Sequence, residues 1–137
     1  MIVLLDLEWV EKNETNLTQL SAMRVDGNWS VTGCLDLIVK PSASCLREAD
    51  HIAFGGYSTK LFEGAFSVDE CMPDFLKWLE PEDNILVWSK SNIKVLNELL
   101  NVQAPLVEGR ITSVAKVVRK AAASNGNAFE SPYGKAL

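Results

Sequence analysis

Three observations on the sequence predict a single α/β domain built around a mixed β-sheet. Residues 2–39 contain three strand patterns separated by turn signals, which is typical of an antiparallel meander. Helical and strand patterns then alternate along the rest of the chain, as they do where helices join parallel strands. The chain has 137 residues, of which 47% are hydrophobic, and this is enough for one domain with its own core.

Residues 2–9, IVLLDLEW, form the first expected strand. Such a nearly continuous apolar run is typical of a strand that is covered on both faces. Successive side chains of a strand point to opposite faces, so Asp6 and Glu8 should share one face while Leu5 and Leu7 share the other. Two neighbouring carboxylates repel each other, and a shared proton, a basic partner or a divalent cation relieves that repulsion. A solvated strand end without any ligand is the plainer alternative.

The next two expected strands cover residues 17–25 and 29–39, and Asp26-Gly27-Asn28 between them is a hairpin signal. The pattern breaks up over residues 41–64, where we expect a loop region. Ser67 and Glu70 then form a capping box, which predicts the start of a helix. Pro73 lies within the apolar stripe of that helix, so we expect the helix either to start later or to bend.

The second half of the chain predicts strand–helix pairs. Residues 84–88 (NILVW) are typical of a buried parallel strand, and Ser91 is expected to cap the helix that follows. Residues 106–111 predict a short fifth strand, and Thr112 is expected to cap the next helix. In that helix we expect one apolar face to point inward and one basic face outward. The inward residues would be Val114, Val117, Val118 and Ala121, and the outward ones Lys116, Arg119 and Lys120.

The composition limits the classes of function. The net charge of −5 and the isoelectric point near 4.9 argue against a broad electrostatic grip on nucleic acid. They leave room for a small acidic metal site, because bound cations reverse the local electric field. No apolar run reaches the roughly 20 residues that cross a bilayer, so no membrane span is expected. The three isolated cysteines favour reduced thiols in a cytoplasmic protein over a structural zinc site.

With these elements in order, the chain resembles the DEDD superfamily of 3′–5′ exonucleases, which have a ribonuclease H-like fold. LLDLEW (residues 4–9) is similar to the first motif of that family, an acid pair that ends the first strand. ILVWSKSNIKVL (residues 85–96) is similar to its second motif. LTQLSAMRVDGNW, LIVKP and residues 51–79 are similar to the segments between these motifs, so the resemblance extends over most of the chain.

The resemblance implies that Asp6 and Glu8 are catalytic metal ligands and that Asn92 is a weaker third ligand. The resemblance also implies that the protein uses two divalent ions, Mg²⁺ or Mn²⁺, to hydrolyse nucleotides from the 3′ end of single-stranded DNA or RNA. One ion activates the attacking water in that family, and the other stabilises the departing 3′ oxygen. The loop with His51, Phe54 and Gly55 would contact the terminal nucleotide, since glycine permits close backbone approach. A surface histidine is the alternative for His51.

Two features depart from the family pattern. Asn92 stands where the family has an aspartate, which removes one negative charge and should weaken metal binding. The third motif, a histidine or tyrosine followed by a last aspartate, has no match after Leu106, because no histidine or aspartate occurs there. SPYGKAL (residues 131–137) is similar only to the segment before that motif. The resemblance therefore implies one exonuclease-like domain, residues 1–137, that is truncated at its C-terminus.

A catalytically inactive exonuclease-like module that binds protein or nucleic acid is the second hypothesis. Asn92 and the unmatched third motif favour it, and the negative charge makes a protein partner easier to accept. A sheet face left uncovered by a missing helix would favour a homo-oligomer. The four tryptophans could stack on bases, although core packing is the plainer alternative. A doubly wound α/β domain without this site is the third hypothesis, and the initial meander argues against it.

Overall fold

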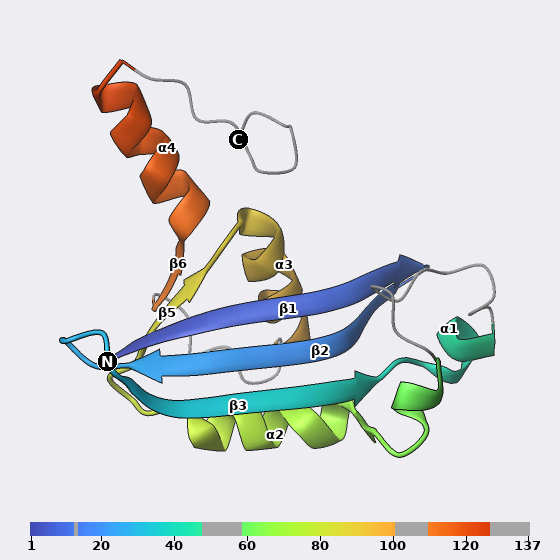
Figure 1. Cartoon of the computed structure of the whole chain (residues 1–137). Coiled ribbons are helices and arrows are strands. Elements are labelled where there is room, and N and C mark those ends of the chain that lie inside the picture. Colours follow the sequence, from blue (N-terminus) through green and yellow to red (C-terminus); the bar gives the residue numbers. More distant parts are fainter. Residues whose placement is uncertain (13, 48–58, 101–109, 127–137) are drawn as a thin grey trace.

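The computed structural model describes residues 1–12, 14–47, 59–100 and 110–126, which form a mixed six-stranded sheet with helices (Figure 1). The strands are β1 (Ile2–Lys12), β2 (Glu14–Val25), β3 (Val31–Lys40), β4 (Phe66–Ser67), β5 (Asn84–Val87) and β6 (Ile111–Ser113). The helices are α1 (Ala43–Arg47), α2 (Val68–Trp78), α3 (Lys90–Leu99) and α4 (Val114–Ser124), together with the 3₁₀ helix η2 (Thr59–Phe62).

The first strand lies in the interior of the sheet, whose order is β4-β3-β2-β1-β5-β6. The strands β1, β2 and β3 form an antiparallel meander, and β5 and β6 extend the sheet parallel to β1. The predicted α/β fold, a three-strand meander followed by strand–helix units, is confirmed. The interior position of β1 matters for function, because this strand carries the acid pair.

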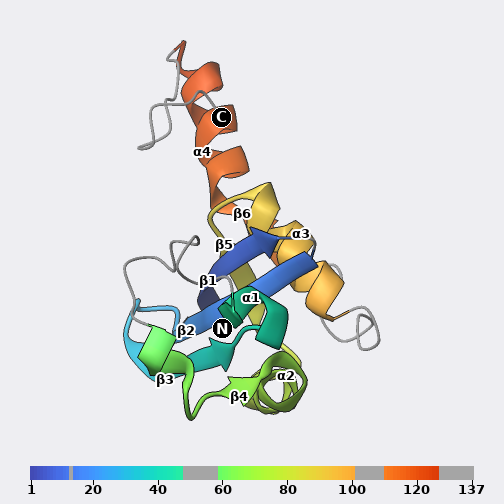
Figure 2. The same cartoon turned by 90° about the vertical axis from the view of Figure 1, so that its right-hand side faces the viewer.

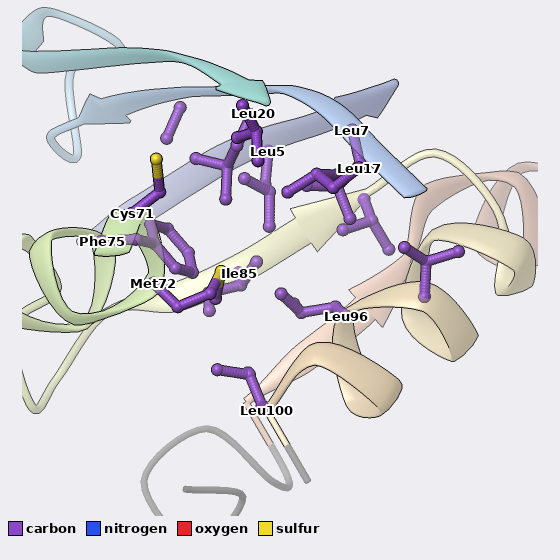
Figure 3. Close-up of a cluster of buried hydrophobic side chains, with 14 of the residues drawn as sticks. Leu5, Leu7, Leu17, Leu20, Cys71, Met72, Phe75, Ile85, Leu96 and Leu100 are labelled. Atoms are coloured by element: carbon purple, nitrogen blue, oxygen red, sulfur yellow. The ribbon is translucent and has the colours of Figure 1, made fainter. Parts of the chain in front are cut away.

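The hydrophobic core lies between the sheet and the two helices α2 and α3 (Figures 1 and 3). Leu5 and Leu7 of β1 point into this core and are 5% and 2% exposed. Phe75 from α2 and Leu96 from α3 belong to the same cluster and are fully buried. The apolar area that these side chains remove from water is the main term that stabilises the fold.

A buried ion pair ties β2 to the segment between α2 and β5. Arg24 donates to the carboxylate of Asp83 at 2.8–3.2 Å, and the two residues are 7% and 0% exposed. The Arg24 guanidinium also donates to the carbonyl of Trp78 at 2.6 Å and lies 4.2 Å from the centre of the Trp78 ring. Hydrogen bonds from Arg24 and from the backbone N–H of Glu80 outweigh burial and lower the pKa of Asp83.

The helix starts differ in part from those predicted. Ser67 and Glu70 form the predicted capping box, and α2 begins at Val68 with Pro73 inside it rather than starting later. The cap of α3 is Ser89 and not Ser91, because β5 ends one residue earlier than predicted and the helix follows at once. Ser113 rather than Thr112 caps α4, since β6 extends to Ser113.

The expectation for the last helix is wrong. Its valines were expected to face inward, but Ala115 is the buried residue of α4 and Val117 is 55% exposed. The reason is geometric: α4 leaves the end of β6 and stands away from the sheet in both views (Figures 1 and 2). Among the described residues, no helix is long and apolar enough to cross a membrane.

Candidate metal site on the outer face of the sheet

The acid pair lies on the face of the sheet opposite α2 and α3, which we call the outer face. Asp6 and Glu8 both project there and are exposed, whereas Leu5 and Leu7 point into the core, so the predicted division of these side chains is confirmed. The expectation that β1 is covered on both faces is wrong for the described part of the chain, where Leu4 is 38% exposed. The carboxylates are therefore in contact with solvent and not in a buried pocket.

A β-bulge follows the acid pair directly. Glu8 is opposite Gln19, but Trp9 is opposite Leu17, so Thr18 is an extra residue on β2. The Thr18 hydroxyl donates to the Glu8 carbonyl at 3.0 Å. A bulge bends the strand that carries the extra residue and increases the local twist, and this one lies on β2 directly beside the second acid of β1.

The two carboxylates suit a hard divalent cation. Their positions are roughly 6.6 Å apart along the strand, so both side chains can converge on one ion. Neither carboxylate has a hydrogen-bond or ion-pair partner among the described residues. The same residues contain no group of three or more His, Cys, Asp or Glu side chains that could hold a metal. An ion bound by Asp6 and Glu8 would therefore complete its shell with water or substrate oxygens, as Mg²⁺ commonly does.

The structure gives Asn92 a different role. The Asn92 side-chain oxygen accepts hydrogen bonds from the backbone N–H and the hydroxyl of Ser89, both at 3.1 Å, and the residue is 6% exposed. This oxygen, the atom that would bind a metal, is thus part of the capping box of α3. A metal role for Asn92 stays a prediction that would require this cap to open.

A third acid lies on the outer face, and the sequence pattern did not point to it. Asp36 of β3 is opposite Ser21 of β2, which in turn is opposite Asp6 of β1. Hydrogen bonds from Ser21 at 2.6 Å and Gln19 at 2.9 Å lower the pKa of Asp36. The alternation in β3 could have placed Asp36 on the outer face, but its alignment with Asp6 follows only from the strand register.

An apolar hollow of about 500 Å³ adjoins these acids. Asp6, Ser21 and Asp36 contribute its polar side chains. The apolar part includes Leu4, Met23, Cys34, Leu86, Trp88 and Val114. The hollow thus combines two of the three carboxylates of the outer face with a broad apolar floor.

The other candidates are dispersed or lie outside the described residues. His51, Phe54 and Gly55 fall in the undescribed segment 48–58, so their contact with a nucleotide stays a prediction. Trp88 lines the hollow and Trp29 is 67% exposed on the hairpin. Trp9 and Trp78 pack against the core.

Comparisons with known proteins support the fold. No family model and no curated protein matches the chain. Its structure is similar to product-bound exonuclease I, with a TM-score of 0.73 and 15% identity over 97% of this chain and 35% of that one. Similar values hold for Escherichia coli exonuclease I with a dT13 oligonucleotide (TM-score 0.65, 15% identity, 97% and 32% covered). They also hold for exonuclease I from Methylocaldum szegediense (TM-score 0.67, 14% identity, 99% and 33% covered).

These similarities establish the ribonuclease H-like exonuclease fold predicted from the sequence. At sequence identities of 14–15%, they support a shared fold and not a shared function. The chain spans about a third of the length of these enzymes.

Proposed function

We propose that this chain is a metal-dependent 3′–5′ exonuclease-like domain that acts on the 3′ end of single-stranded nucleic acid. The observation that carries the proposal is the position of the acid pair. Asp6 and Glu8 project side by side from an interior strand of an exonuclease-like sheet, on its open face and without a partner among the described residues.

The chemistry follows from the donor set. Asp6 and Glu8 would hold Mg²⁺ or Mn²⁺ through carboxylate oxygens, and such ions activate water and stabilise the leaving oxygen of a phosphodiester. The solvent exposure of both acids leaves room for water and for a phosphate in the remaining coordination positions. The apolar floor beside Asp6, with Trp88, is suited to contact a base or a sugar.

Single-stranded DNA is the substrate that we would test first. One of the similar structures, that of E. coli exonuclease I, holds a dT13 oligonucleotide. The net charge of −5 gives this chain little long-range attraction for a polyanion, so we expect affinity to depend on the cation and on base contacts.

Metal binding is the first measurement, because its readout does not need catalysis. Titration of Mn²⁺, followed by electron paramagnetic resonance, should reveal a site that is weakened at least tenfold in Asp6→Asn and in Glu8→Gln. Asp74→Asn and Glu63→Gln are matched controls, since both residues are exposed and neither is on β1. Equal Mn²⁺ binding by the site variants and the controls would refute the site.

Cleavage of 5′-labelled single-stranded DNA and RNA is the second measurement. The chain should shorten these substrates stepwise from the 3′ end with Mn²⁺, and both site variants should lose this activity while the controls keep it.

A catalytically inactive module that binds protein or nucleic acid is the alternative function. One observation favours it. Of the expected metal ligands, only the two acids Asp6 and Glu8 are available among the described residues, because the Asn92 oxygen already accepts the hydrogen bonds of the α3 cap. Mn²⁺ binding at Asp6 and Glu8 without cleavage of either substrate would support this alternative.

A further inference from the structure

The helix α4 carries positive charge that no side chain of the described structure neutralises. Lys116, Arg119 and Lys120 are all exposed. Positions three and four apart lie on one side of a helix, with about 5–6 Å between neighbouring Cβ atoms, so these three residues form one basic face. None of the three side chains has an ion-pair or hydrogen-bond partner among the described residues.

This basic face differs in charge from the rest of the chain. Residues 111–126 contain the three cations and no acid. The remainder of the chain carries −8, since the net charge of −5 includes these three positive charges. In α3, by contrast, Lys94 lies 3.9 Å from Glu98, which is the i,i+4 pairing of an ordinary solvated helix. A helix face with cations alone is typical of a surface that binds a polyanion.

The basic face begins beside the proposed metal site. Val114, the first residue of α4, lines the same hollow as Asp6. From there α4 stands away from the sheet (Figures 1 and 2). Lys116 lies in the first turn, and the other two cations follow about 4.5–6 Å further along the helix axis. A chain-like ligand that extends from the metal site along α4 would therefore meet the three cations in succession.

The direction of α4 is fixed by its first turn. The Trp88 carbonyl accepts hydrogen bonds from the backbone N–H of Ala115 at 2.9 Å and from the Ser113 hydroxyl at 3.1 Å. These bonds join the start of the helix to the end of β5, so the basic face keeps its position relative to the sheet. A ligand thus meets a preformed surface, which lowers the cost of ordering on binding.

We propose that the basic face of α4 binds the phosphodiester backbone of the single strand whose 3′ end is held at Asp6 and Glu8. The inference rests on the proposed function for the choice of this ligand. Asp6, Glu8 and Asp36 give the outer face a negative charge that opposes a polyanion, and cations next to them offset this repulsion. Charges more than about 10 Å away are largely screened at 0.1 M salt, so the local basic face acts on nearby phosphates although the net charge is negative.

The test is the salt dependence of oligonucleotide binding. A 5′-labelled oligothymidylate is titrated with the full chain at several salt concentrations, in the presence of a chelator so that no cleavage occurs, and fluorescence anisotropy is read. The α4 variant combines Lys116→Gln, Arg119→Gln and Lys120→Gln. It should lower the slope of log K against log salt by about 2, because each phosphate contact of a single strand contributes about 0.7.

A matched control separates the basic face from the net charge. The control variant combines Lys40→Gln, Lys77→Gln and Lys94→Gln, which remove the same total charge from exposed positions on β3, α2 and α3. Its slope should stay within about 0.5 of that of the wild type. An equal fall in both variants would overturn the proposal, and so would a wild type whose binding does not depend on salt.

Single substitutions provide a measurement for the case in which the α4 variant does not fold. Lys116→Gln, Arg119→Gln and Lys120→Gln should each lower the slope by about 0.7. Lys116→Arg and Lys120→Arg keep the charge and should keep the slope. Glutamine variants that keep the slope of the wild type would contradict phosphate binding by α4.

Binding and cleavage fail independently in these experiments. A chain that loses salt dependence in the α4 variant but cuts no substrate with Mn²⁺ would support this inference and refute the nuclease function. A chain that cuts its substrate, and whose salt dependence is unchanged in the α4 variant, would refute this inference alone.

Discussion

Replacing Arg24 by methionine should destabilise the fold by about 3–5 kcal/mol at pH 7. The substitution keeps most of the side-chain volume but leaves Asp83, which is 0% exposed, as a buried charge without its cation. It also removes the hydrogen bond to the Trp78 carbonyl and the contact with the Trp78 ring. Breaking the ion pair accounts for the lower end of this range. The lost cation–π contact with Trp78 adds about 0.5–2 kcal/mol and accounts for the upper end.

The measurement is urea unfolding followed by tryptophan fluorescence, with circular dichroism as a second probe. The control is the double variant Arg24→Met, Asp83→Asn, which has no buried charge and keeps an acceptor for the Glu80 backbone N–H. We expect the double variant to be more stable than Arg24→Met alone. A loss below about 1 kcal/mol for Arg24→Met would refute the reasoning, because it would mean that Asp83 finds water or another partner.

The same pair predicts a pH dependence. The pKa of Asp83 is lowered in the folded state, so its contribution to stability is complete above the unfolded pKa of about 3.9. The contribution is lost as the pH falls through the folded pKa. The stability difference between the wild type and Arg24→Met should therefore shrink on acidification, beginning above about pH 4, because the unpaired buried Asp83 of the variant is protonated more readily than the paired one of the wild type.

Three further outcomes are expected. Ser67→Ala should cost about 1 kcal/mol in urea unfolding, because it removes the capping box with Glu70, and an unchanged midpoint would contradict this role. Asn92→Asp should keep the cap, because a carboxylate oxygen accepts the same hydrogen bonds from Ser89. If position 92 is the third ligand that we propose, the added charge should also strengthen Mn²⁺ binding in the same resonance titration, and no gain would mean that position 92 does not face the ion. Gly33→Ala should change the free energy of unfolding by less than about 1 kcal/mol, because the added Cβ would meet Trp78 and Arg24 at ordinary contact distances of 3.5 and 3.6 Å. A larger loss of stability would show that the contact of Arg24 with Trp78 tolerates no displacement.

The order and type of the main elements could be predicted from the sequence because their signals are local. The alternation around Asp6 and Glu8 put both acids on one face, and the Ser67–Glu70 spacing located the start of α2. Periodicity and capping depend on residues within one or two turns, which a single sequence displays directly.

The composition of the site could be predicted only in part. The acids of β1 were identified from their spacing, but Asp36 was not, because its place beside Ser21 and Asp6 depends on the pairing of three strands. Strand register is set by contacts between distant segments, and a shift of one residue would turn Asp36 to the other face.

The α/β class, the meander and the shared direction of the two acids could be predicted without coordinates, since they follow from side-chain alternation and turn chemistry. The three-dimensional arrangement was needed to show that the described residues leave the outer face open, that the Asn92 oxygen serves as a cap, and that Val117 of α4 points away from the core. An apolar stripe has the same pattern whether it packs inside its own chain or faces solvent. The direction in which α4 leaves β6 is what distinguishes the two (Figure 1).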